Sequence, residues 1–383
     1  MGEWKELALD TAAIINPTES LSKGVKAKKI AMTIIQPFTK RVHSYSVEKY
    51  NGGMKFRNGD TLVARITPCL ENGKTVFVDI LDDGEIGFGS TEYIVLREKQ
   101  GTSDKDFLYY FAISPEFRDV AILSMTGSSG RQRVQTDVVR NHLFSLPPLP
   151  EQKAIASVLS SLDDKIELLH RQNKTLEAMA ETLFRQWFVE EAQEGWEKND
   201  IYSLIDVVYG FPFKSKFFND DKKGHPLIRI RNLKNGFSNI YTDEECDEKH
   251  FLNCGDLVAG MDGEFRLYIW SGEKSLLNQR ACKFIPKHNY VPTLFVFSLM
   301  KTHLHYYENV KVGTTVIHLC KSDIDEIRIH VPPKEVLIEF GKIAACIHEK
   351  IKNNSKQIRT LEKLRDTLLP KLMSGEVRVE YEN

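Results

Sequence analysis

One feature constrains this 383-residue chain most: two long segments match each other without gaps at an offset of 185 residues. Leu146-Pro147-Pro148 opens the first segment, and Val331-Pro332-Pro333 opens the second. The identical pairs are Lys165/Lys350, Ile166/Ile351, Gln172/Gln357, Thr175/Thr360, Leu176/Leu361, Glu177/Glu362, Thr182/Thr367 and Leu183/Leu368. This pattern indicates an internal duplication, so we expect the same arrangement of elements twice.

Both segments carry an apolar heptad pattern. In the first, Ile155, Leu162, Leu169, Leu176 and Leu183 recur every seven residues, interleaved with Leu159, Ile166, Asn173, Ala180 and Trp187. In the second, Phe340, Ile347, Asn354, Leu361 and Leu368 are interleaved with Ala344, Ile351, Ile358, Arg365 and Leu372. The pattern predicts two helices of about 35–40 residues, each about 55–60 Å long, with an a/d seam. Prolines suit the start of each helix, and we expect Pro370 to kink or end the second.

A seam of this length cannot stay exposed, and the nearest partner for each helix is the other one. The block between them is long enough to fold with its ends close together, which allows antiparallel pairing. Ordinary core helices or a coiled-coil homodimer are the alternatives, and the duplication favours pairing within one chain. Polar Asn173, Asn354 and Arg365 should fix the register at some cost in stability. The residues predicted to pair the helices or dock a partner are Ile155, Leu159, Leu162, Ile166, Leu169, Leu176, Leu183, Phe340, Ile347, Ile351, Ile358, Leu361 and Leu368.

The remaining blocks are rich in strand patterns. Turn residues bound short runs that are apolar or alternate between apolar and polar residues, as strands do. Examples are TLVARI (61–66) and EYIVLR (92–97) in the first block, and PLIRIRNL (226–233) and RLYIW (266–270) in the second. Helical stretches are limited to residues near 106–123 and 291–307. We predict an α+β fold with two mixed α/β domains, at 1–146 and 191–331. Two long antiparallel helices, at 147–190 and 332–383, separate them with pseudo-two-fold symmetry.

Matches outside the helices are weaker but consistent with duplication. GSSGRQRVQTD (127–137) parallels GTTVIHLCKSD (313–323), and GDTLVARI (59–66) resembles GDLVAGM (255–261). Trp4 and Trp196 lie near the two starts.

Composition limits where the protein works. Six cysteines without a Cys-x-x-Cys pair suit a reducing compartment. No secretory signal and no apolar run long enough for a membrane span are present, so we expect a cytoplasmic protein.

The motifs that resemble catalytic or metal sites are each incomplete. Pro-Pro occurs twice, but Leu149 and Lys334 follow where an amino-methyltransferase motif needs an aromatic residue. Glu71–Thr75 resembles the end of a phosphate-binding loop, but Pro68 replaces its first glycine, so a hairpin turn is the better interpretation. His303 and His305 lack further ligands at a suitable spacing. We therefore predict no enzyme activity, no metal and no cofactor in this chain.

Local charge points to nucleic acid, although the net charge is only -1. Residues 23–57 contain nine Lys or Arg side chains and one acid, Glu48, and residues 214–234 contain seven against two acids. Such density attracts phosphates, and Arg, Gln and Asn can read base edges. The alternative for any single residue is a solvated surface charge. The candidate DNA-binding residues are Lys26, Lys28, Lys29, Lys40, Arg41, Lys74, Arg131, Gln132, Arg133, Lys214, Lys216, Arg229, Arg231 and Lys234.

Several stretches together resemble the specificity subunit of type I restriction–modification enzymes. They are LPPLPEQKAIASVLSSLDDKIELLHRQNKTLEAMAETLFRQWFVE (146–190), VARITPCLENGKTVFV (63–78), GFGSTEYIVLR (87–97), GFPFKS (210–215), GDLVAGMDGEF (255–265), LLNQRACKFIP (276–286) and GTTVIHLCKSDI (313–324). The resemblance covers essentially the whole chain, and the proline-opened central helix is its most specific part.

The resemblance implies two target-recognition domains that each read one half of an asymmetric, bipartite DNA sequence. It implies helices that bind two methylation subunits and, through them, restriction subunits. S-adenosylmethionine, ATP and Mg²⁺ would then belong to those partners. The competing hypothesis is a coiled-coil scaffold that binds proteins and has no DNA specificity.

Overall fold

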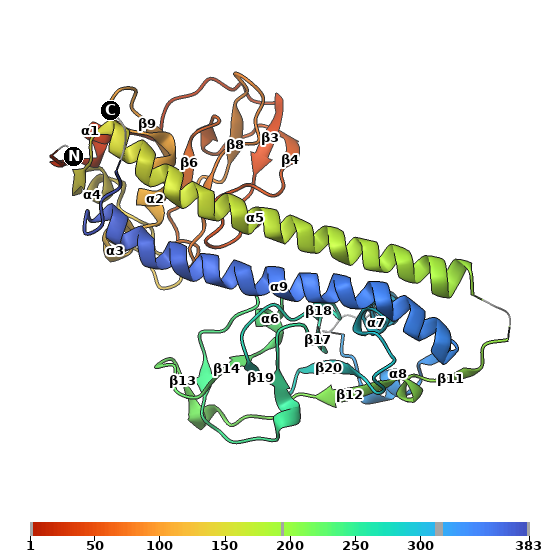
Figure 1. Ribbon diagram of the computed structural model, residues 1–383. Helices are drawn as coiled ribbons and strands as arrows, with labels where there is room; N and C mark the ends of the chain where they lie inside the picture. Colours follow the sequence, from red (N-terminus) through yellow and green to blue (C-terminus); the bar gives the residue numbers. More distant parts are fainter. Residues whose placement is uncertain (1–2, 193–194, 311–316, 381–383) are drawn as a thin grey trace. The chain divides into compact units, whose positions relative to one another are not determined.

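The computed structural model describes residues 3–192, 195–310 and 317–380, and the chain divides into two compact units. Unit 1 contains residues 1–165 and 361–383, and unit 2 contains residues 166–360. Both boundaries fall inside the two long helices, α5 (Leu149–Arg185) and α9 (Lys334–Met373), so each unit contains part of both (Figure 1).

Unit 1 contains two four-stranded sheets and a two-stranded ribbon. One sheet has the order β2-β9-β6-β7, the other β4-β3-β8-β5, and the ribbon pairs β1 with β10. The strands are β1 (Lys5–Ala8), β2 (Ala13–Ile15), β3 (Lys26–Ile30), β4 (Ser46–Lys49), β5 (Lys55–Phe56), β6 (Thr61–Ala64), β7 (Thr75–Phe77), β8 (Gly87–Gly89), β9 (Tyr93–Glu98) and β10 (Leu143–Leu146). The short helices are α1 (Leu9–Ala12), α2 (Lys105–Ile113), α3 (Pro115–Leu123) and α4 (Thr136–Arg140).

Unit 2 repeats this topology. The sheet β12-β20-β17-β18 corresponds to β2-β9-β6-β7, and the ribbon β11-β21 corresponds to β1-β10. The second sheet has five strands in the order β13-β15-β14-β19-β16. Its central parallel pair, β14 with β19, matches the parallel pair of β3 with β8 in unit 1. The duplication read from the helices therefore extends through both strand-rich blocks.

The strands of unit 2 are β11 (Lys198–Asp200), β12 (Ile205–Tyr209), β13 (Phe218–Asn219), β14 (His225–Ile228), β15 (Tyr241–Thr242), β16 (Phe251–Leu252), β17 (Leu257–Gly260), β18 (Leu267–Ile269), β19 (Ser275–Leu277), β20 (Ala281–Pro286) and β21 (Arg328–His330). Its helices are α6 (Ile230–Leu233), α7 (Thr293–Val310) and α8 (Lys321–Asp325), and a π-helical turn at Gln186–Glu190 follows α5. Three-residue 3₁₀ turns lie at Ile201–Ser203, Ser215–Phe217 and Glu248–His250.

The expected helices near 106–123 and 291–307 are confirmed as α2, α3 and α7. The Asp104 carboxylate caps α2 by accepting hydrogen bonds from the backbone N–H groups of Asp106 and Phe107, both at 3.0 Å. The expected strand over 226–233 is wrong beyond Ile228, because α6 begins at Ile230. There the Asn232 side chain accepts a hydrogen bond from the Arg229 backbone N–H and starts a helical turn.

The two long helices pair antiparallel within each unit, as predicted. In unit 1 the start of α5 shares a core with the end of α9, through Ile155, Leu159, Leu369 and Leu372. In unit 2 the end of α5 shares a core with the start of α9, through Ala180, Phe184, Phe340 and Ile347. The helices contain 37 and 40 residues. Pro370 does not end the second, because α9 continues to Met373.

The seam residues are buried to different degrees. Ile155, Leu159, Ile166, Leu169, Phe340, Ile347, Ile351 and Ile358 are buried, while Leu162, Leu176, Leu183, Leu361 and Leu368 are half-buried. The polar seam residues have partners: Asn354 donates to the Asn173 carbonyl Oδ1 at 2.9 Å, and Arg365 lies 2.8 Å from Asp163. A docking role for the seam residues stays a prediction, as do the four domain boundaries.

Candidate nucleic-acid interface

The Gly/Ser-rich sequence identified as a candidate for DNA reading forms a short hairpin loop in unit 1. Thr126 and Arg133 pair through two backbone hydrogen bonds, of 3.1 and 2.9 Å, and enclose Gly127–Gln132. Gly127 and Gly130 have φ of 128° and 75°, a region that side chains with a Cβ rarely adopt. The loop residues Ser128, Ser129 and Arg131 are exposed, and Gln132 is half-buried.

The base of this loop is fixed against the end of β6. The Thr67 N–H donates to the Gln132 carbonyl at 3.0 Å, and the Val134 N–H donates to the Arg65 carbonyl at 2.8 Å. Val134 is fully buried beneath the loop. The loop therefore projects exposed side chains from a rigid base, which is the arrangement that a reading element needs.

Arg133 does not project freely with its neighbours. Its Nη2 donates to Glu92 Oε1 at 2.7 Å and its Nε donates to Glu92 Oε2 at 3.0 Å, which is a bidentate pair, and Arg65 lies 3.9 Å from Oε2. The hydrogen bonds from Arg133 hold the pKa of Glu92 below its usual value of 4.5. Arg133 is therefore committed to the loop base. The Arg131 backbone N–H donates to the Ser128 carbonyl at 3.0 Å, but the Arg131 guanidinium has no hydrogen bond or ion pair to another described residue.

The equivalent position in unit 2 is partly described. The sequence repeat GTTVIHLCKSD begins at Gly313, and residues 313–316 lie outside the described residues. The following residues repeat the loop base: the Gly263 N–H donates to the Ile317 carbonyl at 2.9 Å, and the Leu319 N–H donates to the Met261 carbonyl at 2.8 Å. His318 Nδ1 lies 2.5 Å from Asp262 Oδ1, and Arg280 lies 3.5 Å from the other oxygen.

Several bases of the stretch 23–57 are neutralised, Lys29 by Glu48 of the same stretch and the others by acids from elsewhere in unit 1. Lys28 pairs with Asp82 at 3.0 Å and with Glu85 at 2.8 Å, and both pairs raise its pKa. Lys29 pairs with Glu48, and Arg41 bridges Asp79 and Asp164. Lys26 remains exposed at the start of β3. The local count of nine bases to one acid thus overstates the charge of the folded surface.

Two candidates of unit 1 have structural roles. Lys40 is only 7% exposed, and its ammonium donates to Asp106 and to the Ser160 hydroxyl, both at 2.7 Å. A phosphate cannot reach a group enclosed in this way, so the expectation of DNA contact by Lys40 is corrected. Lys74 is half-buried and donates to the Met32 carbonyl at 2.8 Å, which ties two loops together.

The candidates of unit 2 are mostly accessible. Lys214, Lys216, Arg231 and Lys234 are exposed, and the Lys216 ammonium lies 4.8 Å from the centre of the Phe217 ring. Arg229 is half-buried, and its Nε has no hydrogen-bond partner among the described residues. Because α6 interrupts the expected strand, Arg229 and Arg231 do not lie on one face of a strand.

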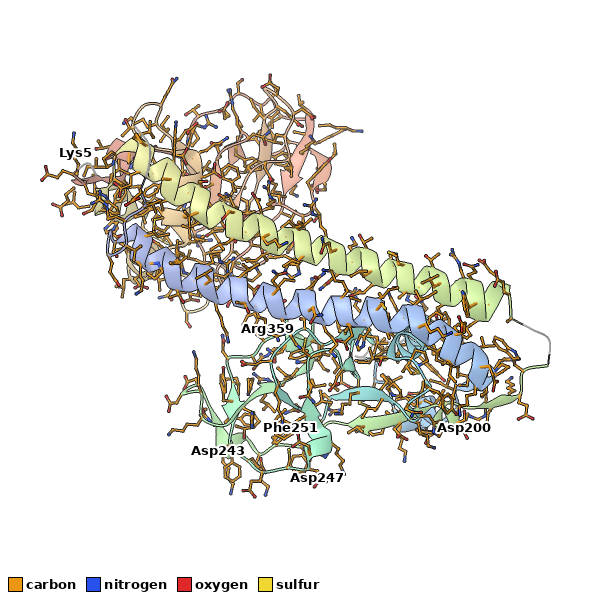
Figure 2. The ribbon with its side chains drawn as sticks, viewed as in Figure 1. Lys5, Asp200, Asp243, Asp247, Phe251 and Arg359 are labelled. Carbon is orange, nitrogen blue, oxygen red and sulfur yellow. The ribbon has the colours of Figure 1, made fainter. Side chains whose placement is uncertain are left out.

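The surface of unit 2 that faces α9 is occupied by the helix. Arg359 projects from α9 toward the strands, whereas Asp243, Asp247 and Phe251 lie on the far side of the domain (Figure 2). The Arg359 guanidinium donates to the carbonyl groups of Ser271 and Gly272. Because α9 covers this face, DNA would have to contact unit 2 elsewhere on its surface.

The motifs set aside from the sequence have ordinary positions. Glu71–Lys74 lie in the connection between the antiparallel strands β6 and β7, as the hairpin interpretation predicts. His303 and His305 lie on α7. Across the described part of the chain, no group of three or more His, Cys, Asp or Glu side chains is arranged to hold a metal, and no helix is long and apolar enough to span a membrane.

The sequence reasoning missed the side chains that hold the loop bases. Arg65 and Glu92 of unit 1 lie inside the quoted stretches, as do Asp262 and Arg280 of unit 2, but none was singled out. Aligning the two copies strand by strand would not have found them, because it pairs Glu92 with Arg280 and Asp262 with Ile66.

Comparison with known proteins identifies the family. The model of the "Type I restriction modification DNA specificity domain" matches residues 1–178 and 193–363. The type I restriction enzyme MjaIX specificity subunit of Methanocaldococcus jannaschii is 29% identical over 317 residues, which cover 72% of this chain and 69% of that protein. The HindI specificity subunit of Haemophilus influenzae is 24% identical over 406 residues, which cover 84% and 87%.

A solved structure supports the fold. The S subunit of a type I restriction–modification system from M. genitalium superposes with a TM-score of 0.52 at 17% identity, over 97% of this chain and 96% of that one. The family model covers nearly all of both copies of the repeat, and its match confirms the resemblance found in the sequence. The chain belongs to the type I restriction–modification DNA specificity family.

Proposed function

We propose that this chain selects the DNA sequence on which a type I restriction–modification complex acts. The strand-rich domain of each unit reads one half of a bipartite target. The single observation that carries this is the topological repeat: one framework occurs twice, and the sequences of its loops differ between the copies. Two different reading surfaces on equivalent frameworks favour an asymmetric target with two different halves.

The proposal assigns the chemistry to other subunits. The chain supplies recognition without catalysis, in keeping with its family. S-adenosylmethionine for methylation, and ATP and Mg²⁺ for restriction, would bind the partner subunits. The proposal includes a cytoplasmic location, which six cysteines without disulfide bonds favour.

The proposed DNA contacts are the candidates whose side chains are accessible. In unit 1, Arg131 and Gln132 would read base edges, and Lys26 would contact phosphate. In unit 2, Arg231 would read bases, and Lys214, Lys216 and Lys234 would contact phosphates. The partnered residues Lys28, Lys29 and Arg41 would act by shaping the surface.

The helices are the proposed docking site for two methylation subunits, which would in turn bind restriction subunits. In unit 2 a groove of about 470 Å³ lies between α5 and α9, lined by Leu168, Arg171, Gln172, Thr175, Leu176 and Lys350. Leu168 is 40% exposed at this groove, and Ile343 is 45% exposed on α9. Apolar side chains left open on otherwise paired helices suit a further helix or loop of a partner.

The decisive experiment maps methylated adenines in a host that carries this system, and then footprints the purified complex on the target found. We expect two protected half-sites about one helical turn of DNA apart, or about 10 base pairs. Base changes in the gap between them should be tolerated. Lengthening α5 near Gln172–Leu176 by whole turns should change the gap and leave the half-sites unchanged.

A single continuous footprint, or equal binding to all sequences with the methylation subunits present, would refute the proposal. The scaffold alternative predicts that the protein binds DNA weakly and that this affinity depends little on salt concentration. A reader that neutralises phosphates should instead lose affinity steeply as salt rises.

A further inference from the structure

The two loop bases share a charge arrangement that the sequence comparison did not reveal. In unit 1 the Glu92 carboxylate lies between Arg133 and Arg65. In unit 2 the Asp262 carboxylate lies between His318 and Arg280. Each base thus has one carboxylate flanked by two basic side chains.

The first basic residue is equivalent in the two copies. Arg133 and His318 are separated by the same 185 residues as the helices. The residues before them, Gln132 and Ile317, each accept a backbone hydrogen bond at the carbonyl from the N–H of a residue just beyond β6 or β17. The residues after them, Val134 and Leu319, are buried and apolar. Both side chains are partly exposed, at 46% and 54%.

The carboxylate, in contrast, comes from different strands. Glu92 directly precedes β9, and the residue directly before the equivalent strand β20 is Arg280. Asp262 lies two residues after β17, and the residue two after the equivalent strand β6 is Ile66. Glu92 before β9 is thus replaced by Arg280 in the second copy, and the carboxylate is supplied there by Asp262 from the other side of the loop base. Both loop bases therefore contain a contact between an acidic and a basic side chain, although the acidic residue occupies different positions in the two copies.

We infer that Glu92 and Asp262 are positioning residues that fix Arg133 and His318. The Glu92–Arg133 pair holds the loop Gly127–Gln132 in the conformation in which it reads one half-site, and the Asp262–His318 pair fixes the equivalent described residues Ile317–Leu319 of unit 2 for the other half-site. This inference rests on the proposed function and deepens it. Arg133 then acts through loop geometry, and the DNA contacts of unit 1 fall to its neighbours Arg131 and Gln132.

The energetics suit such a role. An isolated exposed ion pair contributes little, but a bidentate Arg–carboxylate pair fixes both the distance and the orientation of the guanidinium. Glu92 is only 22% exposed, so its carboxylate is held by the sheet while Arg133 follows it. Backbone hydrogen bonds fix the base of the loop, but its two glycines with positive φ leave the loop itself few restraints, and the Glu92–Arg133 pair adds one from a side chain.

The test uses the chain with its methylation subunits and duplexes that carry the mapped target, with one half-site altered at a time. Glu92→Gln should reduce discrimination at one half-site about tenfold, the loss that corresponds to one charge-assisted hydrogen bond, and leave the other unchanged. Asp262→Asn should affect the opposite half-site. Asp137→Asn and Glu264→Gln are the matched controls, because each removes one exposed carboxylate nearby, and neither should change discrimination.

A charge exchange separates positioning from direct contact. Arg133→Glu alone should lose discrimination, and adding Glu92→Arg should restore most of it if Arg133 only positions the loop. Failure of the exchange to restore discrimination would show that Arg133 contacts DNA, and a loss at both half-sites by Glu92→Gln would show a general structural defect. Either result overturns the inference.

Hydrogen exchange without DNA separates this inference from the proposed function. Glu92→Gln should accelerate exchange of the amides of residues 127–133 and leave the α2 amides unchanged. Unchanged exchange in the loop would refute the pair as its restraint. Equal binding of the wild-type complex to all duplexes would instead refute the proposed function.

Discussion

Both units bury apolar helix residues against their strand-rich domains, but unit 1 adds buried polar side chains at two places where unit 2 has Leu337 and Ala180. In unit 1, buried Gln152 donates to the carbonyl groups of Thr102 and Pro147 and accepts from the Asp104 N–H. At the 185-residue offset, Gln152 corresponds to Leu337, which is fully buried in unit 2.

A second pair of positions shows the same contrast. Asp163 of unit 1 is buried between Arg365 and the Tyr110 hydroxyl, which lies 2.6 Å away. Its counterpart is His348, and the counterpart of Arg365 is Ala180. In unit 2, His348 Nε2 lies 2.9 Å from the Gly255 carbonyl, so a contact with the backbone takes the place of the buried ion pair. Elsewhere in unit 2 the Phe188 ring centroid lies 4.8 Å from Phe295 and 5.0 Å from Phe340. The two units therefore share one backbone topology but differ in the side-chain contacts that hold it to the long helices.

The contrast has an energetic consequence. We call the contact between a strand-rich domain and the long helices a joint. A joint made of polar side chains loses stability when one partner is removed, because the buried group that remains keeps its full desolvation cost. An apolar joint depends on volume and tolerates similar shapes. Single substitutions should therefore damage the two units by different mechanisms.

The largest effect is expected from Arg365→Met, which leaves the Asp163 carboxylate buried without its cation. Unit 1 should lose about 3–5 kcal/mol of stability, and adding Asp163→Leu should recover most of it. Hydrogen exchange of amides within unit 1, followed in denaturant, measures both changes. If the double variant is as unstable as the single one, the ion pair is not what specifies this joint.

A reciprocal exchange tests whether the joints are interchangeable. Gln152→Leu would strand three polar backbone groups, and Leu337→Gln would bury an amide among apolar side chains, so each should cost about 2–3 kcal/mol. Chemical denaturation of each variant against the wild type gives the values. Costs below 0.5 kcal/mol for either (about the range of a neutral surface change) would remove the distinction drawn between the units.

The polar pair in the helix seam of unit 2 should respond with the opposite sign. Replacing both Asn173 and Asn354 with leucine should raise stability by about 1 kcal/mol, because a hydrogen-bonded polar layer gives way to apolar packing. The register of the helices should become less unique, which sedimentation would detect as self-association. A monodisperse, equally ordered variant would show that the asparagines do not set the register.

The smallest effect is a response to acid. Burial lowers the pKa of His250, His303 and His348, all in unit 2, below the usual 6.5. Their neutral forms therefore stabilise unit 2 above pH 6.5, and this contribution is lost as the pH falls through the lowered values. In unit 1, burial would raise the pKa of Glu19, but hydrogen bonds from Arg97 and Arg57 outweigh it and lower the pKa below 4.5.

Acidification from pH 6.5 to 4.5 should consequently weaken unit 2 before unit 1. Hydrogen exchange of each unit across this range is the measurement, and His348→Gln should flatten the response of unit 2. Earlier loss of unit 1 would contradict the assignment.

Much of the architecture followed from periodicity and duplication. The heptads predicted both long helices and their antiparallel pairing, since the a/d residues repeat over several turns and dominate the packing. Partners that depend on tertiary structure could not be predicted. The acids Asp79, Asp82 and Glu85, which neutralise Arg41 and Lys28, lie far from them in sequence. The start of α6 depends on one side chain, Asn232, that competes with the strand pattern around it.

The division of the helices between the units also bears on how the protein is made. Unit 2 is one continuous stretch, so all of its residues have been synthesised by the time Thr360 is added. Unit 1 is discontinuous, and its core contains Leu369 and Leu372 beside Ile155 and Leu159. The N-terminal domain, although made first, cannot complete its core until the last helix has left the ribosome. The order of synthesis and the order of completion are therefore opposite for the two units.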